Sequence, residues 1–115
     1  MTNRWRSVAA LAALTGWLTA GASAPSVTEC LEGSDFIVNA ARARENGMSR
    51  AAFLARMEED FRLIQAFPPE LRWFAKDADD ERLLLDAARD VFDAPAAPEA
   101  HRARFLAVCL ARASL

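Results

Sequence analysis

The chain lacks several features that mark common classes of protein. It has no Tyr, one His, one Lys and only 4 Gly among its 115 residues. Its 14 basic and 16 acidic residues give a formal charge of −2, so no excess of positive charge favours nucleic acid as a partner. With 53% hydrophobic residues, the chain is too apolar to stay disordered. These counts predict one folded domain, because about 100–200 residues per domain is usual.

Motifs for catalysis and cofactor binding are missing as well. No glycine-rich phosphate loop and no Gly-x-Ser-x-Gly nucleophile motif occurs, and two Cys with one His are too few for a zinc site. Asp77, Asp79 and Glu81 have the alternate spacing of a calcium loop. Such a loop also needs Gly at its sixth position and Glu at its twelfth, where this chain has Arg82 and Ala88. We therefore expect no enzyme activity, no metal and no cofactor.

The first segment has the three parts of a secretory signal peptide. A short basic start with Arg4 and Arg6 precedes an apolar stretch over residues 8–20, which small residues follow. A membrane anchor is the alternative, but about 20 apolar residues are needed to span a bilayer and this stretch is shorter. Arg replaces Lys almost everywhere, which is typical of GC-rich bacterial genes. The predicted destination is the periplasm or the outside of a bacterial cell.

Two cleavage sites fit the small side chains that signal peptidase requires at −3 and −1. They lie after Ala22 and after Ala24. Cleavage after Ala22 is preferred, because Pro25 would directly follow the other cut. The prediction is a signal peptide over residues 1–22 and a single exported domain over residues 23–115, with no stable membrane insertion after cleavage.

The two cysteines predict a structural disulfide. Cys30 and Cys109 are the only cysteines, and an even number in an oxidising compartment usually forms bridges. A redox-active pair would more often have Cys-x-x-Cys spacing, which is absent. A bond between them closes a loop of about 80 residues, which stabilises a chain by about 4 kcal/mol.

Composition and apolar spacing predict helices throughout the exported domain. Ala, Leu, Arg and Glu dominate, whereas Val, Ile and Thr are sparse. Apolar residues recur every three or four positions and not every second one. The expected helices run from Val27 to near Gly47, from the N-cap Ser49 to before Pro68, from Asp77 to Asp93, and from Pro98 onward, with a short helical turn within residues 70–76.

The residues expected in the core share one face of each predicted helix. They are Cys30, Leu31, Ser34, Ile37, Val38 and Ala41, then Phe53, Leu54, Met57, Phe61 and Ile64, then Leu84, Ala87, Ala88 and Val91, and finally Phe105, Leu106, Cys109 and Leu110. Cys30 lies early in the first helix and Cys109 late in the last, so their bond requires these helices to be antiparallel neighbours. The predicted fold is all-α: four helices and a short turn, with one disulfide between the first and last helices.

Several polar residues are expected on the solvated surface. His101 stands beside Glu99 and Arg102 in the first turns of the last helix, with no nucleophile motif for it to serve. Four arginines alternate with apolar residues and are offset by nearby acids; they are Arg42, Arg44, Arg102 and Arg104.

A cluster of large apolar residues lies in the connector between the second and third helices. It comprises Phe67, Leu71, Trp73 and Phe74. Two interpretations stay open. The side chains cap the helical core, or they form a patch that binds a partner protein, because aromatic clusters near Arg are typical interface anchors.

Three segments together resemble a class of small exported proteobacterial proteins. They are residues 41–47 (Ala-Arg-Ala-Arg-Glu-Asn-Gly), residues 90–95 (Asp-Val-Phe-Asp-Ala-Pro) and the late Cys109. The class shares a signal peptide, an early Cys, an Arg-x-x-Gly helix end, a Val-aromatic-x-x-Pro corner and a late Cys. The resemblance covers most of the exported domain and implies export and a helical fold, with no site residues.

Together, these features predict a non-catalytic periplasmic or secreted helical protein that acts by contacting another protein. Two alternatives are similar to the chain in outline: periplasmic acid-stress chaperones and helical immunity proteins that neutralise periplasmic toxins. For a chaperone, protonating the carboxylates of the connectors would loosen the helices while the disulfide keeps them compact.

Overall fold

The computed structural model describes residues 24–72 and 74–113, and this part of the chain contains helices and no strand. The elements are α2 (Val27–Glu45), α3 (Arg50–Ile64), the 3-10 turn η1 (Pro69–Leu71), α4 (Ala78–Asp93) and α5 (Pro98–Ala113). The all-α prediction is confirmed. The predicted signal peptide over residues 1–22 and the predicted site residue Trp73 lie outside the described residues.

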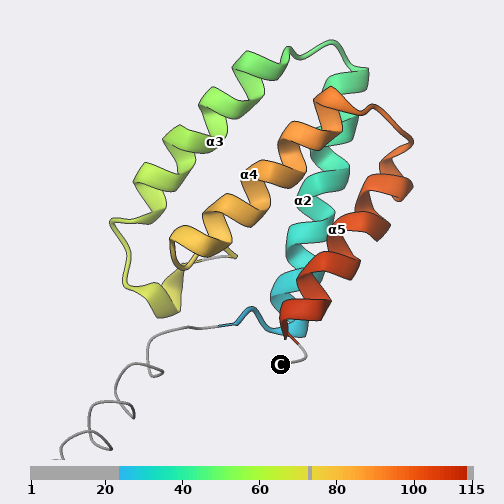
Figure 1. Cartoon of the computed structure of the whole chain (residues 1–115). Coiled ribbons are helices and arrows are strands. Elements are labelled where there is room, and N and C mark those ends of the chain that lie inside the picture. The colour runs from blue at the N-terminus through green and yellow to red at the C-terminus, as the bar shows by residue number, and fades with distance from the viewer. Residues whose placement is uncertain (1–23, 73, 114–115) are drawn as a thin grey trace, which may run out of the picture.

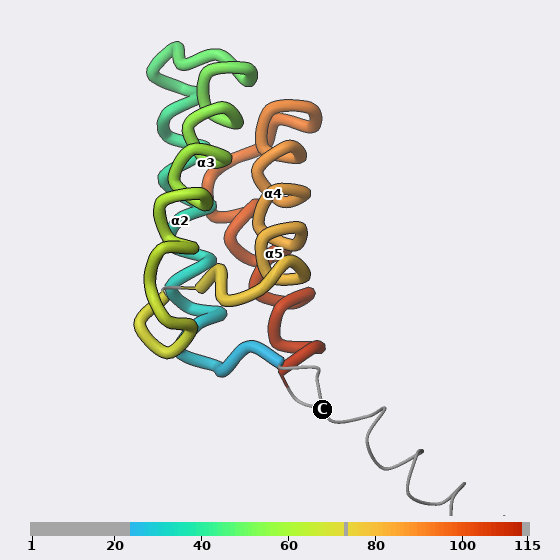
Figure 2. The backbone as a smooth tube through the Cα atoms, turned by 90° about the vertical axis from the view of Figure 1, so that its left-hand side faces the viewer, coloured from blue at the N-terminus to red at the C-terminus, as the bar shows by residue number. Residues whose placement is uncertain are grey.

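The four α-helices form two layers, with α2 and α3 on one side and α4 and α5 on the other (Figure 2). In Figure 1, α2 and α5 lie side by side and run in opposite directions, as the predicted disulfide requires. α2 packs most extensively against α5 and also contacts α4. α3 packs against α4 and does not pack along the length of α2. The two helices of the α2–α3 layer are therefore held together mainly through α4 in the opposite layer.

Local signals set the ends of the helices. At the start of α2, Ser26 and Glu29 form a capping box, in which each side chain accepts a hydrogen bond from the other residue's backbone N–H. Ser49 and Asp77 are the N-caps of α3 and α4, and their side chains accept hydrogen bonds from backbone N–H groups three residues on. Gly47 follows α2 with a φ of 98°, a left-handed conformation that suits glycine and ends the helix as predicted.

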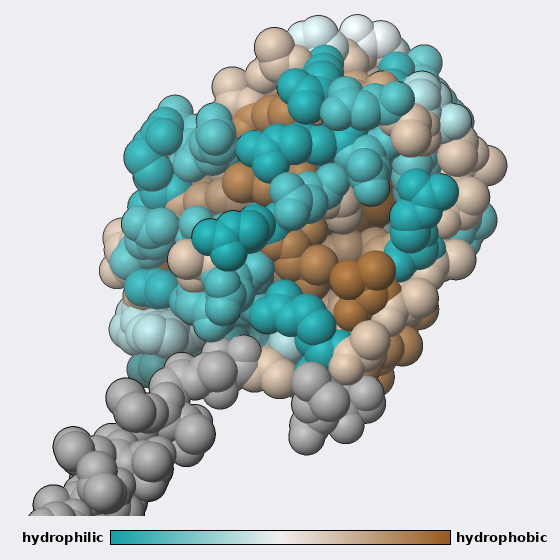
Figure 3. All heavy atoms as spheres, in the orientation of Figure 1, coloured by the Kyte–Doolittle hydropathy of each residue, from teal (hydrophilic) through white to brown (hydrophobic). Residues whose placement is uncertain are grey.

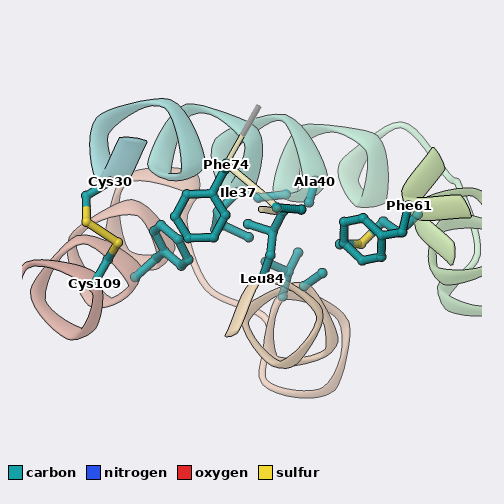
Figure 4. Close-up of a cluster of buried hydrophobic side chains, with 13 residues drawn as sticks. Cys30, Ile37, Ala40, Phe61, Phe74, Leu84 and Cys109 are labelled. Carbon is teal, nitrogen blue, oxygen red and sulfur yellow. A yellow bond between two sulfur atoms is a disulfide. The ribbon is translucent and has the colours of Figure 1, made fainter. Parts of the chain in front are cut away.

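The predicted disulfide is present. Cys30 of α2 and Cys109 of α5 are bonded, with Cα atoms 5.6 Å apart and a sequence separation of 79. Both residues are fully buried at one end of the core, and Phe61 lies toward the other end (Figure 4). The bond therefore joins the first and last helices of the described part of the chain.

Small residues on α2 let α5 approach closely. A Cβ built on Gly33 would lie 2.7 Å from Cε2 of Phe105 and 3.3 Å from Cδ2 of Phe74. The first of these separations is too short for real atoms, so a larger residue at position 33 would displace the Phe105 ring. Ser34 is buried beside it, and its hydroxyl donates a hydrogen bond to the Leu31 carbonyl at 2.7 Å.

Most of the predicted core is confirmed, but the prediction that Leu31 belongs to it is wrong. Each helix buries part of its predicted face, namely Cys30, Ser34, Ile37, Val38, Ala41, Met57, Phe61, Leu84, Ala88, Val91, Phe105 and Cys109. Leu31 is exposed, because it lies one position away from the face that Cys30 and Ser34 direct toward α5. The predicted turn within residues 70–76 is the shorter η1, since the backbone of Arg72 is already extended.

The replacement of both cysteines, Cys30→Ala with Cys109→Ala, should lower the free energy of unfolding by about 4 kcal/mol, because the bond restrains a loop of about 80 residues in the unfolded chain. Urea unfolding followed by far-UV circular dichroism measures this, with the native chain in reductant as the control. A loss below about 1 kcal/mol would contradict the role assigned to the bond.

Candidate partner-binding surface

One arginine determines the shape of the connector between α3 and α4. The guanidinium of Arg72 donates to the carbonyl oxygens of Phe67 at 2.8 Å, Lys76 at 2.9 Å and Gln65 at 3.2 Å. A planar guanidinium suits this task, because its donors point in fixed directions. Arg72 thus ties the end of α3 to the start of α4 across the irregular segment between them.

The connector divides its large apolar side chains between the core and the surface. Phe74 is fully buried, and its ring centroid lies 5.7 Å from that of Phe105. Phe67 and Leu71 are 55% and 69% exposed. Of the residues for which a core role and a partner-binding role both stayed open, Phe74 therefore belongs to the core, and Phe67 and Leu71 lie on the surface.

An ion pair holds the C-terminal end of the connector, next to α4, against α2. The Lys76 ammonium lies 2.5 Å from Oε2 of Glu29, in the first turn of α2. Burial by itself raises the pKa of Glu29, but hydrogen bonds from Lys76 and Ser26 outweigh it, so the pKa lies below its usual value. The same hydrogen bond raises the pKa of Lys76. The pair is therefore charged at neutral pH and joins the connector to α2.

A groove separates α2 from α3. It consists of two adjoining cavities of about 400 and 210 Å³, which share Phe36, Met57 and Asp60. Its other lining residues are Met48, Phe53, Arg56, Phe61, Leu63, Ile64 and Leu84. The groove exists because α3 packs on α4 instead of along α2, which leaves the apolar faces of both helices incompletely covered. We call it the α2–α3 groove.

Aromatic rings hold the first half of α3 in place beside this groove. The ring centroid of Phe53 lies 5.8 Å from that of Phe36 on α2 and 5.6 Å from that of Phe92 on α4. Tilted pairs at these separations are favourable for aromatic rings. At the other end of α3, Leu63 lines the groove and is 62% exposed. Apolar surface on α3 is therefore most accessible near its C-terminal end.

Exposed apolar residues occur along the chain from the end of α3 into the connector. Leu63, Phe67 and Leu71 follow one another at four-residue intervals and are each more than half exposed. Phe67 and Leu71 belong to the predicted cluster of the connector, whereas Leu63 was not expected to be part of an exposed set. The sequence did contain an indication that Leu63 is exposed. Leu63 is adjacent to Ile64 on a helix, and only one of two adjacent helical residues can face the core directly.

His101 corrects another expectation. It was expected on the solvated surface, yet only 3% of it is exposed. It lies four and eight residues before the buried Phe105 and Cys109, so it shares their face of α5. Burial lowers the pKa of His101 below its ordinary value of 6.5, and the nearby Arg104 and Arg44 lower it further, while Asp90 opposes them.

Two of the four arginines expected to be solvated have structural roles instead. Arg44 donates to the carbonyl oxygens of Val91 at 2.7 Å and Ala96 at 3.0 Å, which joins α2 to the end of α4. Arg102 donates to the Ser34 hydroxyl at 3.1 Å and pairs with Asp35, which joins α5 to α2. Both bind partners far away in the sequence, which local patterns do not identify.

No cluster of three or more His, Cys, Asp or Glu side chains within the described residues is suited to a metal ion. None of the described helices is long and apolar enough to cross a membrane. No protein-family model, curated protein or solved structure matches the chain.

Acidification should destabilise the fold through His101. Because its pKa is lower in the folded chain than in the unfolded one, the unfolded chain binds the proton more readily. The contribution of neutral His101 to the free energy of unfolding is fully present above the ordinary pKa of histidine. It is lost as the pH falls through the pKa of His101 in the folded chain.

Urea unfolding between about pH 8 and pH 5, the range in which His titrates, measures this contribution. The urea midpoint of the native chain should fall with pH more steeply than that of His101→Gln. Parallel curves for the two proteins would contradict the assignment.

Proposed function

We propose that the chain is an exported, non-catalytic helical module that binds another protein through the α2–α3 groove. The observation that carries this proposal is the apolar lining of the groove, which reaches the surface at Leu63. Contiguous apolar surface left open on a folded domain is typical of interaction sites. The occupant that fits is an amphipathic helix of the partner.

The dimensions of the groove support a helical occupant. Its lining on α3 runs from Phe53 to Ile64, which is about 16 Å at 1.5 Å per residue, or three helical turns. A partner helix would place apolar residues at i, i+3 or i+4, and i+7 against it. Met48 and Met57 line the groove, and their flexible side chains adapt to the shape of such residues.

Two features support the proposed compartment. Disulfides persist in oxidising compartments such as the periplasm and are rare in the cytosol. The Cys30–Cys109 bond is fully buried between α2 and α5, where it holds the core. Export through the signal peptide predicted at residues 1–22 would expose the chain to such conditions.

A charge placed in the α2–α3 groove should weaken partner binding without unfolding the domain. Leu63→Lys changes a side chain that is 62% exposed, so the fold should tolerate it, whereas a buried ammonium in the complex is costly. Val27→Lys on α2 is the matched control, because Val27 is 59% exposed and does not line the groove.

The partner is first identified by photo-crosslinking from position 63 in the native host, with position 27 as the control. Titration of the purified partner by calorimetry should then show that Leu63→Lys weakens binding by more than about tenfold, or 1.4 kcal/mol. Equal crosslinking from both positions, or unchanged affinity of Leu63→Lys, would rule out the groove as the site.

An acid-stress chaperone is the second candidate, and the acid-sensitive contacts favour it. The Glu29–Lys76 pair weakens when Glu29 is protonated, and His101 destabilises the fold when it gains a proton. The Cys30–Cys109 disulfide, by contrast, is not broken by protonation. Acid would therefore loosen the helices while α2 and α5 stay joined.

At strongly acidic pH this candidate predicts loss of the near-UV circular dichroism signal, retained far-UV signal and increased binding of a hydrophobic dye. Glu29→Gln, which removes the titrating partner of Lys76, should move the midpoint of the transition. A domain that keeps its near-UV signal and excludes the dye in acid excludes the chaperone role and leaves the binding proposal intact.

A further inference from the structure

A second cavity lies between α4 and α5, away from the α2–α3 groove. Its volume is about 230 Å³, and its floor includes Ile37 of α2 and Phe105 of α5. The remaining lining residues are Leu83, Asp86, Ala87, Asp90, His101, Arg104 and Val108. Figure 3 shows apolar side chains between hydrophilic ones on the face formed by these two helices. We call this cavity the α4–α5 pocket.

Two exposed side chains of opposite charge line the rim of the α4–α5 pocket. Asp90 lies on the α4 side and Arg104 on the α5 side. Within the part of the chain that the structure describes, neither side chain forms an ion pair. Asp86 differs, because Arg89 pairs with it at 3.0 Å. The pocket therefore offers one unpaired carboxylate and one unpaired guanidinium.

The pocket is also lined by a buried polar group without a hydrogen-bond partner among the described residues. His101 lines the pocket with 3% of its surface exposed, and its Nε2 has no hydrogen-bond partner among the described residues. Leaving a buried nitrogen unpaired costs about 1–3 kcal/mol, and such groups are rare in folded proteins. Asp90 and Arg104 both lie close enough to influence the imidazole electrostatically, in opposite directions.

The size and floor of the pocket limit the ligand to a small molecule with an apolar part. A dry cavity of about 150 Å³ holds benzene, so 230 Å³ is suited to a molecule the size of a single amino acid. Drug-sized ligands occupy larger pockets, of about 300 Å³ and above. Ile37, Phe105 and Leu83 would cover an aliphatic side chain.

From these observations, we propose that the α4–α5 pocket binds a small zwitterion with an aliphatic body, of the class of the free aliphatic α-amino acids. Asp90 receives the ammonium group, Arg104 receives the carboxylate, and the apolar floor covers the side chain. The buried imidazole of His101 lies in the wall of the site and reports its occupation. This site is separate from the α2–α3 groove and does not depend on the function proposed for it.

The probes are L-leucine and two analogues that each lack one charge, 4-methylpentanoate and 3-methylbutylamine. Calorimetry and the NMR signals of the His101 ring report binding to the full exported domain. L-leucine should bind and shift the ring signals, and each analogue should bind at least about tenfold more weakly. Arg104→Gln and Asp90→Asn should each weaken leucine binding to a similar degree.

The controls are Arg62→Gln on α3 and Asp79→Asn on α4, which remove like charges outside the pocket and should leave binding unchanged. Circular dichroism checks that every variant is folded. The absence of binding by L-leucine at millimolar concentration would overturn the proposal. So would equal binding of 3-methylbutylamine with no effect of Arg104→Gln, because the pocket would then accept a simple cation.

Discussion

The close packing of α2 against α5 is the constraint on which the rest of the structure depends. The Cys30–Cys109 bond joins these helices near one end, Gly33 lets the Phe105 ring approach along their length, and Arg102 adds polar contacts to α2. α4 packs against both helices, and α3 is attached mainly through α4. The positions of both cavities follow from these contacts. The α2–α3 groove lies where α3 leaves α2 uncovered, and the α4–α5 pocket lies where α4 and α5 meet over α2.

The two cavities differ in chemistry in a way that suits different ligands. The α2–α3 groove is mostly apolar, contains two methionines and extends over several turns of helix, so its lining resembles the interior of a helical interface. The α4–α5 pocket is smaller and places unpaired charges of both signs around an apolar floor. A macromolecular partner and a small ligand would therefore occupy opposite sides of one domain, with α4 contributing Leu84 to the first site and Asp90 to the second.

Local signals in the sequence predicted the helices well, because caps, turn glycines and apolar periodicity act over a few residues. Ser49, Gly47 and the stripe around Leu84 are examples, and the disulfide followed from cysteine number and position. Contacts between distant segments were harder to predict. Arg72 binds carbonyl groups of an irregular connector, whose path no periodic pattern describes. His101 was missed although its spacing from Phe105 and Cys109 was visible, because a lone histidine near charged neighbours is usually solvated.

The attachment of α3 through α4 and a few aromatic rings has a dynamic consequence. Opening of α3 would break its contacts with α4 and the Phe53 ring contacts, while the covalent α2–α5 pair stays intact. Segments held by fewer buried contacts open at a lower free energy than the whole domain. The backbone amides of α3 would then exchange hydrogen sooner than those of α2. The α3 wall of the α2–α3 groove would then be the part of the domain best able to adjust its position, while the disulfide keeps α2 and α5 joined.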